Sequence, residues 1–240
     1  TRSFSDFMLG GRNVGPWLTA FTYGTTYFSA VLFIGFAGKI GWSFGYSALW
    51  IGVGNALVGV LGVWALLGAR IRRVSLEYNV DTLPEYLERR YDSRFFKLFG
   101  GLCIFIFLIP YSAAVFMGLA YLFRATFNID YTLALLFMGV FTGVYMVMGG
   151  YKSMTMIDFV FGIIMTAGVL VLMWFTLGAG GGLAQMTARL KAMNPQLTAL
   201  VGPPGWWPLF CLVFLTSVAP FAMPQLIQKF YAIKDERSIK

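Results

Sequence analysis

A group of hydroxyl-bearing and glycine residues interrupts an apolar stretch near the N-terminus, over residues 17–38. Its centre reads Tyr23, Gly24, Thr25, Thr26 and Tyr27. Apolar residues continue on both sides. A helix that crosses a bilayer here must give up backbone hydrogen bonds or bury several hydroxyls in hydrocarbon, and both are costly unless the segment lines a cavity or binds something. We therefore predict that this centre forms half of a transport site.

Composition points to the membrane rather than to a soluble fold. Of the 240 residues, 58% are hydrophobic and 12% are charged, and the mean hydropathy is +0.73. A soluble domain carries about 25% charged residues. The chain contains no histidine, and Cys103 and Cys211 lie in apolar runs, which argues against a zinc site and a disulfide framework. We predict an all-α polytopic membrane protein, with one transmembrane domain over residues 1–240 and no cofactor.

Six apolar runs are long enough to cross a lipid bilayer, which takes about 20 helical residues. They cover about residues 17–38, 44–69, 98–123, 131–149, 154–178 and 206–228. Lysine and arginine gather in loop 1–16, after the second and fourth runs, and in the tail 229–240. The other side keeps only Lys39, Arg124, Arg189 and Lys191. This bias predicts a multi-pass protein of the cell inner (plasma) membrane with loop 1–16 and tail 229–240 in the cytoplasm, and it explains the net charge without a nucleic-acid partner.

The last apolar run carries a second interruption. Pro220 and Pro224 stand in it, and Ser217, Phe221 and Gln225 accompany them. Transporters built from inverted repeats place substrate and ion at the membrane midplane, between the discontinuous first helices of their repeats. The chain starts without methionine and ends in a charged segment. We expect it to be a piece of a longer protein, so that part of the site lies elsewhere.

The third and fifth apolar runs each contain a polar feature that has both a structural and a functional interpretation. Pro110 frees a carbonyl one turn earlier, so Tyr111 and Ser112 either contact substrate or accompany a structural kink. Asp158 is the one carboxylate within an expected span, which indicates function. It also completes a pattern with Thr155 that is typical of a capping box at a helix start. The ion-site and helix-cap interpretations of Asp158 both stay open.

The connection between the second and third runs predicts a short amphipathic helix. Thr82 can cap it, with Pro84 in the first turn and Glu85 at the capping-box position. This helix either lies solvated at the interface or takes part in gating. The preceding run 44–69 is rich in glycine, which is typical of a closely packed membrane helix.

Several landmarks, taken in order, resemble the sodium/solute symporter family, which includes sodium-coupled proline, pantothenate, sialic acid and glucose carriers. They are Asp6 to Arg12 (DFMLGGR), Ser29 with Ala30 and Phe33 to Gly35, Thr82 to Tyr91, Gly149 and Gly150 with Asp158, and Pro224 to Phe230. The resemblance covers nearly the whole chain. Each landmark is weak alone, but their order and spacing are specific.

The resemblance implies a leucine-transporter-type inverted-repeat fold, of which the chain holds the first repeat and the start of the second. It implies sodium as the coupling ion, held by carbonyls at the broken first helix and by hydroxyls from a helix beyond this sequence. It further implies that the acid matching Asp158 handles cations and that the tyrosine matching Tyr111 lies near substrate. The expected sodium residues are Thr25, Phe28, Ser29 and Asp158. The expected substrate residues are Gly24, Thr25, Thr26, Tyr27, Tyr111, Ser112, Ser217, Phe221 and Gln225.

The chain departs from the family pattern at three positions. Tyr27 stands where proline carriers have aspartate, which argues against proline as the substrate. Phe161 replaces a glutamine that often follows the acid, and Gln225 replaces a histidine. These two departures leave the sodium stoichiometry open.

The leading hypothesis is a sodium-coupled symporter that imports a small organic solute, such as a carboxylate, amino acid or vitamin, by alternating access. The alternative is a transporter-like membrane sensor fused to a signalling domain outside this sequence. An enzyme is disfavoured, since the spans hold no paired carboxylates and no nucleophile–base pair. A channel is disfavoured because no filter-like repeat or charged ring is visible. The solute and the oligomeric state stay open.

Overall fold

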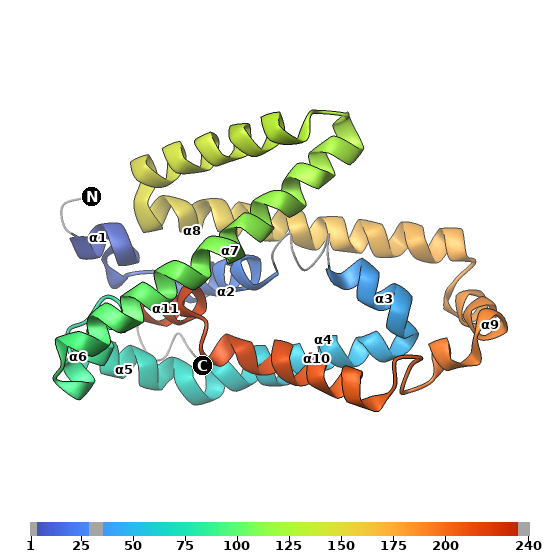
Figure 1. Ribbon diagram of the computed structural model, residues 1–240, viewed down its shortest axis with the longest axis horizontal. Helices are drawn as coiled ribbons and strands as arrows, with labels where there is room; N and C mark the ends of the chain where they lie inside the picture. Colours follow the sequence, from blue (N-terminus) through green and yellow to red (C-terminus); the bar gives the residue numbers. More distant parts are fainter. Residues whose placement is uncertain (1–3, 29–35, 235–240) are drawn as a thin grey trace.

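The computed structural model of the chain describes residues 4–28 and 36–234 (Figure 1). All regular elements in these ranges are helices, and one isolated bridge joins Val14 to Ile233. Four helical stretches are long and apolar enough to cross a membrane: Gly38–Glu77, Arg94–Phe127, Tyr131–Gly180 and Trp206–Ala232. The prediction of an all-α polytopic membrane protein is confirmed.

The N-terminal part reaches the first apolar run through two short elements, α1 (Phe4–Leu9) and η1 (Gly10–Arg12). Helix α2 (Pro16–Tyr27) begins at a proline, whose fixed φ and missing N–H suit a first turn. It ends at Tyr27, and at the following Phe28 ψ is 73° and the backbone leaves the helical region. The run expected over 17–38 thus ends its first helix directly after the hydroxyl-rich centre.

The second apolar run belongs to a long helical stretch that changes its pitch. Its elements are α3 (Gly38–Phe44), η3 (Gly45–Ala48), α4 (Leu49–Gly54), η4 (Asn55–Gly62), η5 (Trp64–Gly68) and α5 (Ala69–Glu77). η4 and η5 are π-helical, a rare form with N–H groups bonded five residues back that often marks functional sites. The apolar run 44–69 marks only part of this stretch, because the helix continues through the charged residues of α5.

A single glycine makes the corner between the fourth and fifth expected spans. Helix α6 (Leu83–Tyr91) leads into α7 (Arg94–Phe127), and α8 (Tyr131–Gly180) follows, bent at Gly150. Gly150 has φ 59° and ψ −169°, and a Cβ there would stand 3.0 Å from the Phe7 ring. Only glycine adopts this conformation without strain, so one residue is enough to turn the chain. The helix resumes directly after Gly150, where the apolar pattern predicted a short connecting loop.

The last apolar run is interrupted, as its two prolines predict. After α9 (Leu183–Met193) and η6 (Pro195–Thr198), helix α10 (Trp206–Val218) passes into a single 3₁₀ turn, η7 (Ala219–Phe221). Helix α11 (Pro224–Ala232) begins at the second proline and continues past the predicted end of the run at residue 228. Lys229, expected to open the cytoplasmic tail, is instead buried in α11.

The two interrupted segments meet inside the helical assembly. α10 packs along α4 and η4, α2 packs against the second half of α8, and α11 contacts α2 and α5 (Figure 1). A core cluster of Tyr23, Val63, Leu226 and Phe230 joins these elements. α7 and the first half of α8 leave most of their large apolar side chains exposed, as expected of surfaces that face lipid. The two interruptions therefore lie close together, around the end of α2.

Candidate functional site

The C-terminal end of α2 presents backbone oxygens that its own helix cannot satisfy. Phe28 N–H donates to the Gly24 carbonyl at 2.8 Å, which is the last bond of this helix ladder within the described residues. The carbonyls of Thr25, Thr26 and Tyr27 belong to the last turn of α2, which has no later N–H groups of its own to pair them. Helix C-termini carry partial negative charge, and hard cations prefer oxygen ligands. This end of α2 is suited to a cation.

Thr25 turns its hydroxyl back onto its own helix. Its Oγ1 donates to the Phe21 carbonyl at 3.0 Å and approaches the Thr22 carbonyl at 3.2 Å. A hydroxyl that donates its proton keeps lone pairs that can coordinate an ion. Gly24, Thr25 and Phe28 line a cavity of about 560 Å³ between α2 and the second half of α8. The cavity wall is otherwise mainly apolar. Ser29, the remaining expected sodium residue, lies outside the described residues.

Tyr27 links the two interrupted helices. Its hydroxyl contacts Asn55 Oδ1 and lies 3.1 Å from the Thr216 carbonyl of α10. Asn55 is 8% exposed and is the first residue of the π-helical stretch η4. Sequence reasoning missed Asn55, although an amide inside the apolar run 44–69 was an available signal. The structure brings Tyr27 and the polar end of α10 together.

Ser217 and Phe221 lie on the α10 side of the same junction. Ser217 is 3% exposed, and its Oγ has no hydrogen-bond partner among the described residues. A Cβ at Gly54 would stand 2.6 Å from that Oγ, so glycine is what allows α4 and α10 to approach here. Phe221 packs against the core cluster that contains Tyr23.

Ser112 and Gln225 lie elsewhere, on a second cavity. It has a volume of about 730 Å³ and lies between α6, α7 and α11. Gln225 Oε1 is buried without a hydrogen-bond partner in the part of the chain that the structure describes. Tyr111 is half-buried on α7 and lines neither cavity. The expected substrate residues therefore fall into three neighbourhoods rather than one.

Asp158 faces a lysine that the sequence did not associate with it. Lys229 Nζ of α11 lies 3.6 Å from Asp158 Oδ2 and 5.2 Å from the centre of the Tyr151 ring. The helix-cap interpretation of Asp158 is wrong, because the helix resumes right after Gly150. Thr155 is inside that helix, where its Oγ1 donates to the Tyr151 carbonyl at 2.8 Å. Asp158 is a paired acid inside the fold.

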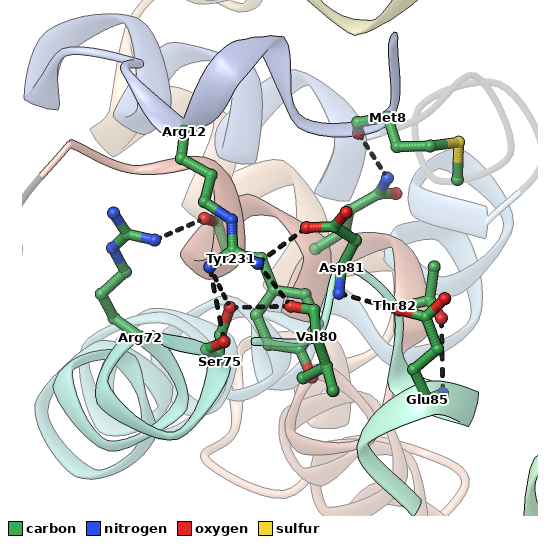
Figure 2. A network of polar contacts seen from close by, with 10 residues as sticks. Met8, Arg12, Arg72, Ser75, Val80, Asp81, Thr82, Glu85 and Tyr231 are labelled. Atoms are coloured by element: carbon green, nitrogen blue, oxygen red, sulfur yellow. Dashed lines mark hydrogen bonds and ion pairs between the residues drawn. The ribbon is translucent and has the colours of Figure 1, made fainter. Parts of the chain in front are cut away.

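A denser polar network lies at the end of the molecule that holds α1 and α6 (Figures 1 and 2). Arg12 Nη2 donates to the Val80 carbonyl and to Asp81 Oδ1, both at 2.7 Å. Its Nη1 donates to Ser75 Oγ at 3.0 Å. Arg72 Nη1 donates to the Tyr231 carbonyl at 2.9 Å. These contacts, shown in Figure 2, tie η1, α5, the 78–82 turn and the end of α11 together.

The predicted cap of α6 by Thr82 is confirmed beside this network, while the Glu85 side chain accepts from the N–H one residue before the one that a capping box uses. Glu85 N–H donates to Thr82 Oγ1 at 3.4 Å, and Glu85 Oε2 accepts from Asp81 N–H at 2.9 Å (Figure 2). On the next turns, Glu88 Oε2 accepts from Lys97 Nζ of α7 at 2.7 Å. This bond and the charge of Lys97 lower the pKa of the Glu88 carboxyl. The short helix is thus fixed at both ends.

Comparisons with known proteins place these observations in a family. A family model described as "Sodium:solute symporter family" matches residues 7–240. The chain is 29% identical over 252 residues to the high-affinity proline transporter PutP of Bacillus subtilis, covering 100% of this chain and 51% of the relative. It is 29% identical over 255 residues to the sodium/proline symporter of Escherichia coli, covering 100% and 48%. The chain spans about half the length of these curated relatives. No solved structure matches.

Proposed function

Because the chain belongs to the sodium:solute symporter family, we propose that this protein is a sodium-coupled secondary transporter for a small organic solute. The observation that carries the proposal is the meeting of two interrupted helices, α2 ending at Tyr27 and α10 ending at Val218. Such breaks offer backbone oxygens and helix ends to ions and solutes without placing a fixed charge in the membrane. Transport then proceeds by alternating exposure of this region to the two sides of the membrane.

The proposed sodium site is centred on the end of α2. Thr25 and Phe28 supply carbonyl oxygens there, with the Thr25 hydroxyl as a further donor of lone pairs, and Ser29 belongs to the same proposal. Asp158 is proposed as a cation-handling acid of the same system, in competition with Lys229 for its carboxylate. Sodium would favour one conformation by its differential affinity, which is what coupling to a solute requires.

The proposed solute is small and polar, and neither α2 nor α10 carries a basic residue to pair with it. Gly24, Thr26, Tyr27, Tyr111, Ser112, Ser217, Phe221 and Gln225 are proposed to contact it in the course of the transport cycle. A carboxylate, an amino acid or a vitamin suits this set, with helix ends to hold a carboxylate group. The relatives named above are proline transporters, so proline is the first solute to test. Tyr27, which replaces an aspartate, argues for a different solute.

The proposed location is the plasma membrane, with loop 1–16 in the cytoplasm. Support comes from the distribution of lysine and arginine along the sequence. Arg12, Arg72 and the end of α11 also belong to one network (Figure 2), which lies at the end of the molecule that holds α1 and α6 (Figure 1). That end is the proposed cytoplasmic side.

Replacement of Thr25 by valine tests the sodium site. Thr25→Val keeps the branched shape and removes the hydroxyl, so we expect the full-length protein to fold normally. The sodium concentration for half-maximal uptake should rise about tenfold, the equivalent of about 1.4 kcal/mol. Uptake is measured in proteoliposomes with radiolabelled proline and a panel of small carboxylates, at varied sodium and constant ionic strength.

Thr19→Val is the matched control for this test. Thr19 Oγ1 bonds the Gly15 carbonyl at 2.9 Å on the same helix, away from the break. It should keep the sodium dependence of the wild type. Unchanged sodium dependence in Thr25→Val would overturn the site, and uptake that ignores sodium in the wild type would overturn the proposed function.

A further inference from the structure

The break in α10 leaves one carbonyl without its helical partner. Ala219 N–H donates to the Leu215 carbonyl, which is the last α-helical bond of α10. The next bond would run from residue 220 to the Thr216 carbonyl, but Pro220 has no N–H. Pro220 is fully buried, so water does not readily replace the missing donor. A carbonyl left unpaired at membrane depth is costly, and the Thr216 carbonyl therefore needs a donor from another helix.

The Tyr27 hydroxyl is that donor. It lies 3.1 Å from the Thr216 carbonyl and in contact with the Asn55 side-chain amide. A phenol carries one proton, and so it can donate to only one of these two neighbours at a time. Asn55 turns Oδ1 to the phenol here; when the proton goes to Thr216 instead, a flip of the amide that exchanges Oδ1 and Nδ2 lets its NH₂ group donate to the phenol oxygen. Asn55 then orients the hydroxyl toward the break in α10.

We propose that Tyr27 and Asn55 are a positioning pair, which holds the break in α2 at a fixed distance from the break in α10 by capping the Thr216 carbonyl. The inference rests on the proposed function, since it assigns the pair a task in sodium affinity. Tyr27 is the last residue of α2. Fixing its hydroxyl fixes the last turn of α2, and with it the carbonyls proposed to bind sodium. Neither side chain need touch the ion.

The test combines local hydrogen–deuterium exchange with sodium-dependent uptake in the full-length protein. Tyr27→Phe and Asn55→Leu each remove one polar partner and keep a similar volume. We expect each to speed exchange in residues 213–223 about tenfold, as loss of one hydrogen bond allows. The double variant should be no faster than either single variant, because both act through one cap. Both single variants should raise the half-saturating sodium concentration more than they lower the maximal rate.

Two further variants separate capping from general damage. Tyr23→Phe is the matched control, since Tyr23 also donates from α2 to a carbonyl, that of Gly59 at 3.4 Å, but away from the proline break. It should leave exchange in residues 213–223 unchanged. Pro220→Ala supplies an N–H to the Thr216 carbonyl from within the helix. Combined with Tyr27→Phe, it should restore slow exchange. The exchange rate of this combined variant can be measured even if Tyr27→Phe alone folds poorly.

The outcomes distinguish this inference from the proposed function. Exchange in Tyr27→Phe equal to that in Tyr23→Phe, or additive effects of Tyr27→Phe and Asn55→Leu, overturns the positioning pair. If Pro220→Ala does not slow exchange in the Tyr27→Phe background, the positioning pair is overturned as well. A wild-type protein whose uptake ignores sodium contradicts the proposed function, whereas the exchange measurements, made without sodium, still decide whether the cap exists.

Discussion

The junction at Tyr27 and the network at Arg12 each join segments that are far apart in the sequence, but with different chemistry. Arg12 is charged and reaches the Ser75 hydroxyl, the Val80 carbonyl and the Asp81 carboxylate at once. Tyr27 is neutral and shares one proton between an amide and a carbonyl. Hydrogen bonds to charged groups contribute about 1.5–3 kcal/mol each, against about 0.5–1.5 kcal/mol for neutral ones. Strong contacts thus hold the helix ends, and weak ones hold the interruptions.

This difference fits the depth at which each region lies. A guanidinium in hydrocarbon is expensive, whereas at the end of the helices it can satisfy several carbonyls and keep part of its hydration. Neutral contacts at depth cost little to break, and hydroxyl, amide and carbonyl groups exchange partners readily. For the proposed transport cycle, the interruptions are the part that can rearrange, and the Arg12 end is the part that stays together.

The pair of Asp158 and Lys229 is intermediate between the two. It is charged like the Arg12 network, yet it lies between α8 and α11, within stretches long and apolar enough to span a membrane. Its separation of 3.6 Å is longer than the 2.7 Å between Arg12 and Asp81. A buried pair is expensive to leave half-broken, but a loose one gains less from its Coulomb attraction. It is the charged contact best placed to open.

The largest expected effect is the loss of Arg12. The Arg12 and Asp81 side chains are 14% and 20% exposed, so Arg12→Ala removes an ion pair and the hydrogen bonds to Val80 and Ser75 from a largely buried network. We expect a loss of about 3 kcal/mol in unfolding free energy, measured by detergent-induced unfolding of the purified protein. Arg12→Lys should recover only part of this, because an ammonium cannot reproduce the planar fork.

Arg70→Ala is the matched control, since Arg70 lies on α5 nearby with an exposed side chain. It should change the unfolding free energy by less than about 0.5 kcal/mol. If Arg12→Ala and Arg70→Ala are equally stable, the Arg12 end is not held by its charges, and the contrast with the Tyr27 junction disappears.

A smaller effect is expected at the intermediate pair. Lys229→Met removes the ammonium and keeps its apolar stem, leaving Asp158 unpaired with 28% of its side chain exposed. We expect a loss of about 2 kcal/mol, and recovery of most of it in the double variant Lys229→Met with Asp158→Asn, in which neither charge is left alone. The measurement is the same unfolding titration, repeated for the two single variants and the double variant.

Sodium-driven uptake by Asp158→Asn then separates the two roles of that acid. Lost sodium dependence in a stable protein supports the cation-handling role. Retained sodium dependence together with lower stability assigns Asp158 to the ion pair alone. A double variant no more stable than Lys229→Met would show that the pair contributes little to stability. The pair of Asp158 and Lys229 would then resemble the weak contacts at Tyr27.

Sequence reasoning located the interruptions because single residues cause them. Pro220 and Pro224 remove N–H groups, and the chain ends α10 and starts α11 at those positions whatever surrounds them. Gly150 marks the corner in α8 in the same way, although the apolar pattern predicted a connection where one residue suffices. The cap at Thr82 is local too, and it was predicted correctly. Local chemistry of this kind can be predicted from the sequence alone.

The partners across helices were not predictable, because they depend on how distant segments pack. Asp158 and Lys229 are far apart in the sequence, and a lysine near the end of an apolar run is typical of a cytoplasmic boundary. Asn55 gave a signal as a lone amide at depth, yet nothing local joins it to Tyr27. The spread of the expected substrate residues over three neighbourhoods has the same cause. Each was identified on its own helix, and helix rotation decides what it faces.

The smallest expected effect concerns Glu88 and Lys97, a surface pair at the Arg12 end. Lys97 Nζ lies 2.7 Å from Glu88 Oε2, with the Lys97 side chain 42% exposed. The hydrogen bond to Lys97 lowers the pKa of Glu88 from its ordinary value of 4.5 in the folded protein. Since the folded state favours the ionised form, the pair stabilises the fold above pH 4.5 and loses this contribution as the pH falls below that value.

Glu88→Gln should therefore be slightly less stable than the wild type at pH 7, and the difference should vanish as the solution is acidified through this range. Because exposed pairs are weak and screened, choline chloride should reduce the difference without adding sodium. Glu77→Gln, at an exposed glutamate of α5, is the control and should show no such salt-sensitive difference. A pH-independent difference for Glu88→Gln would mean that the α6–α7 corner is held by packing instead. The charged character of this end would then be confined to Arg12 and Arg72.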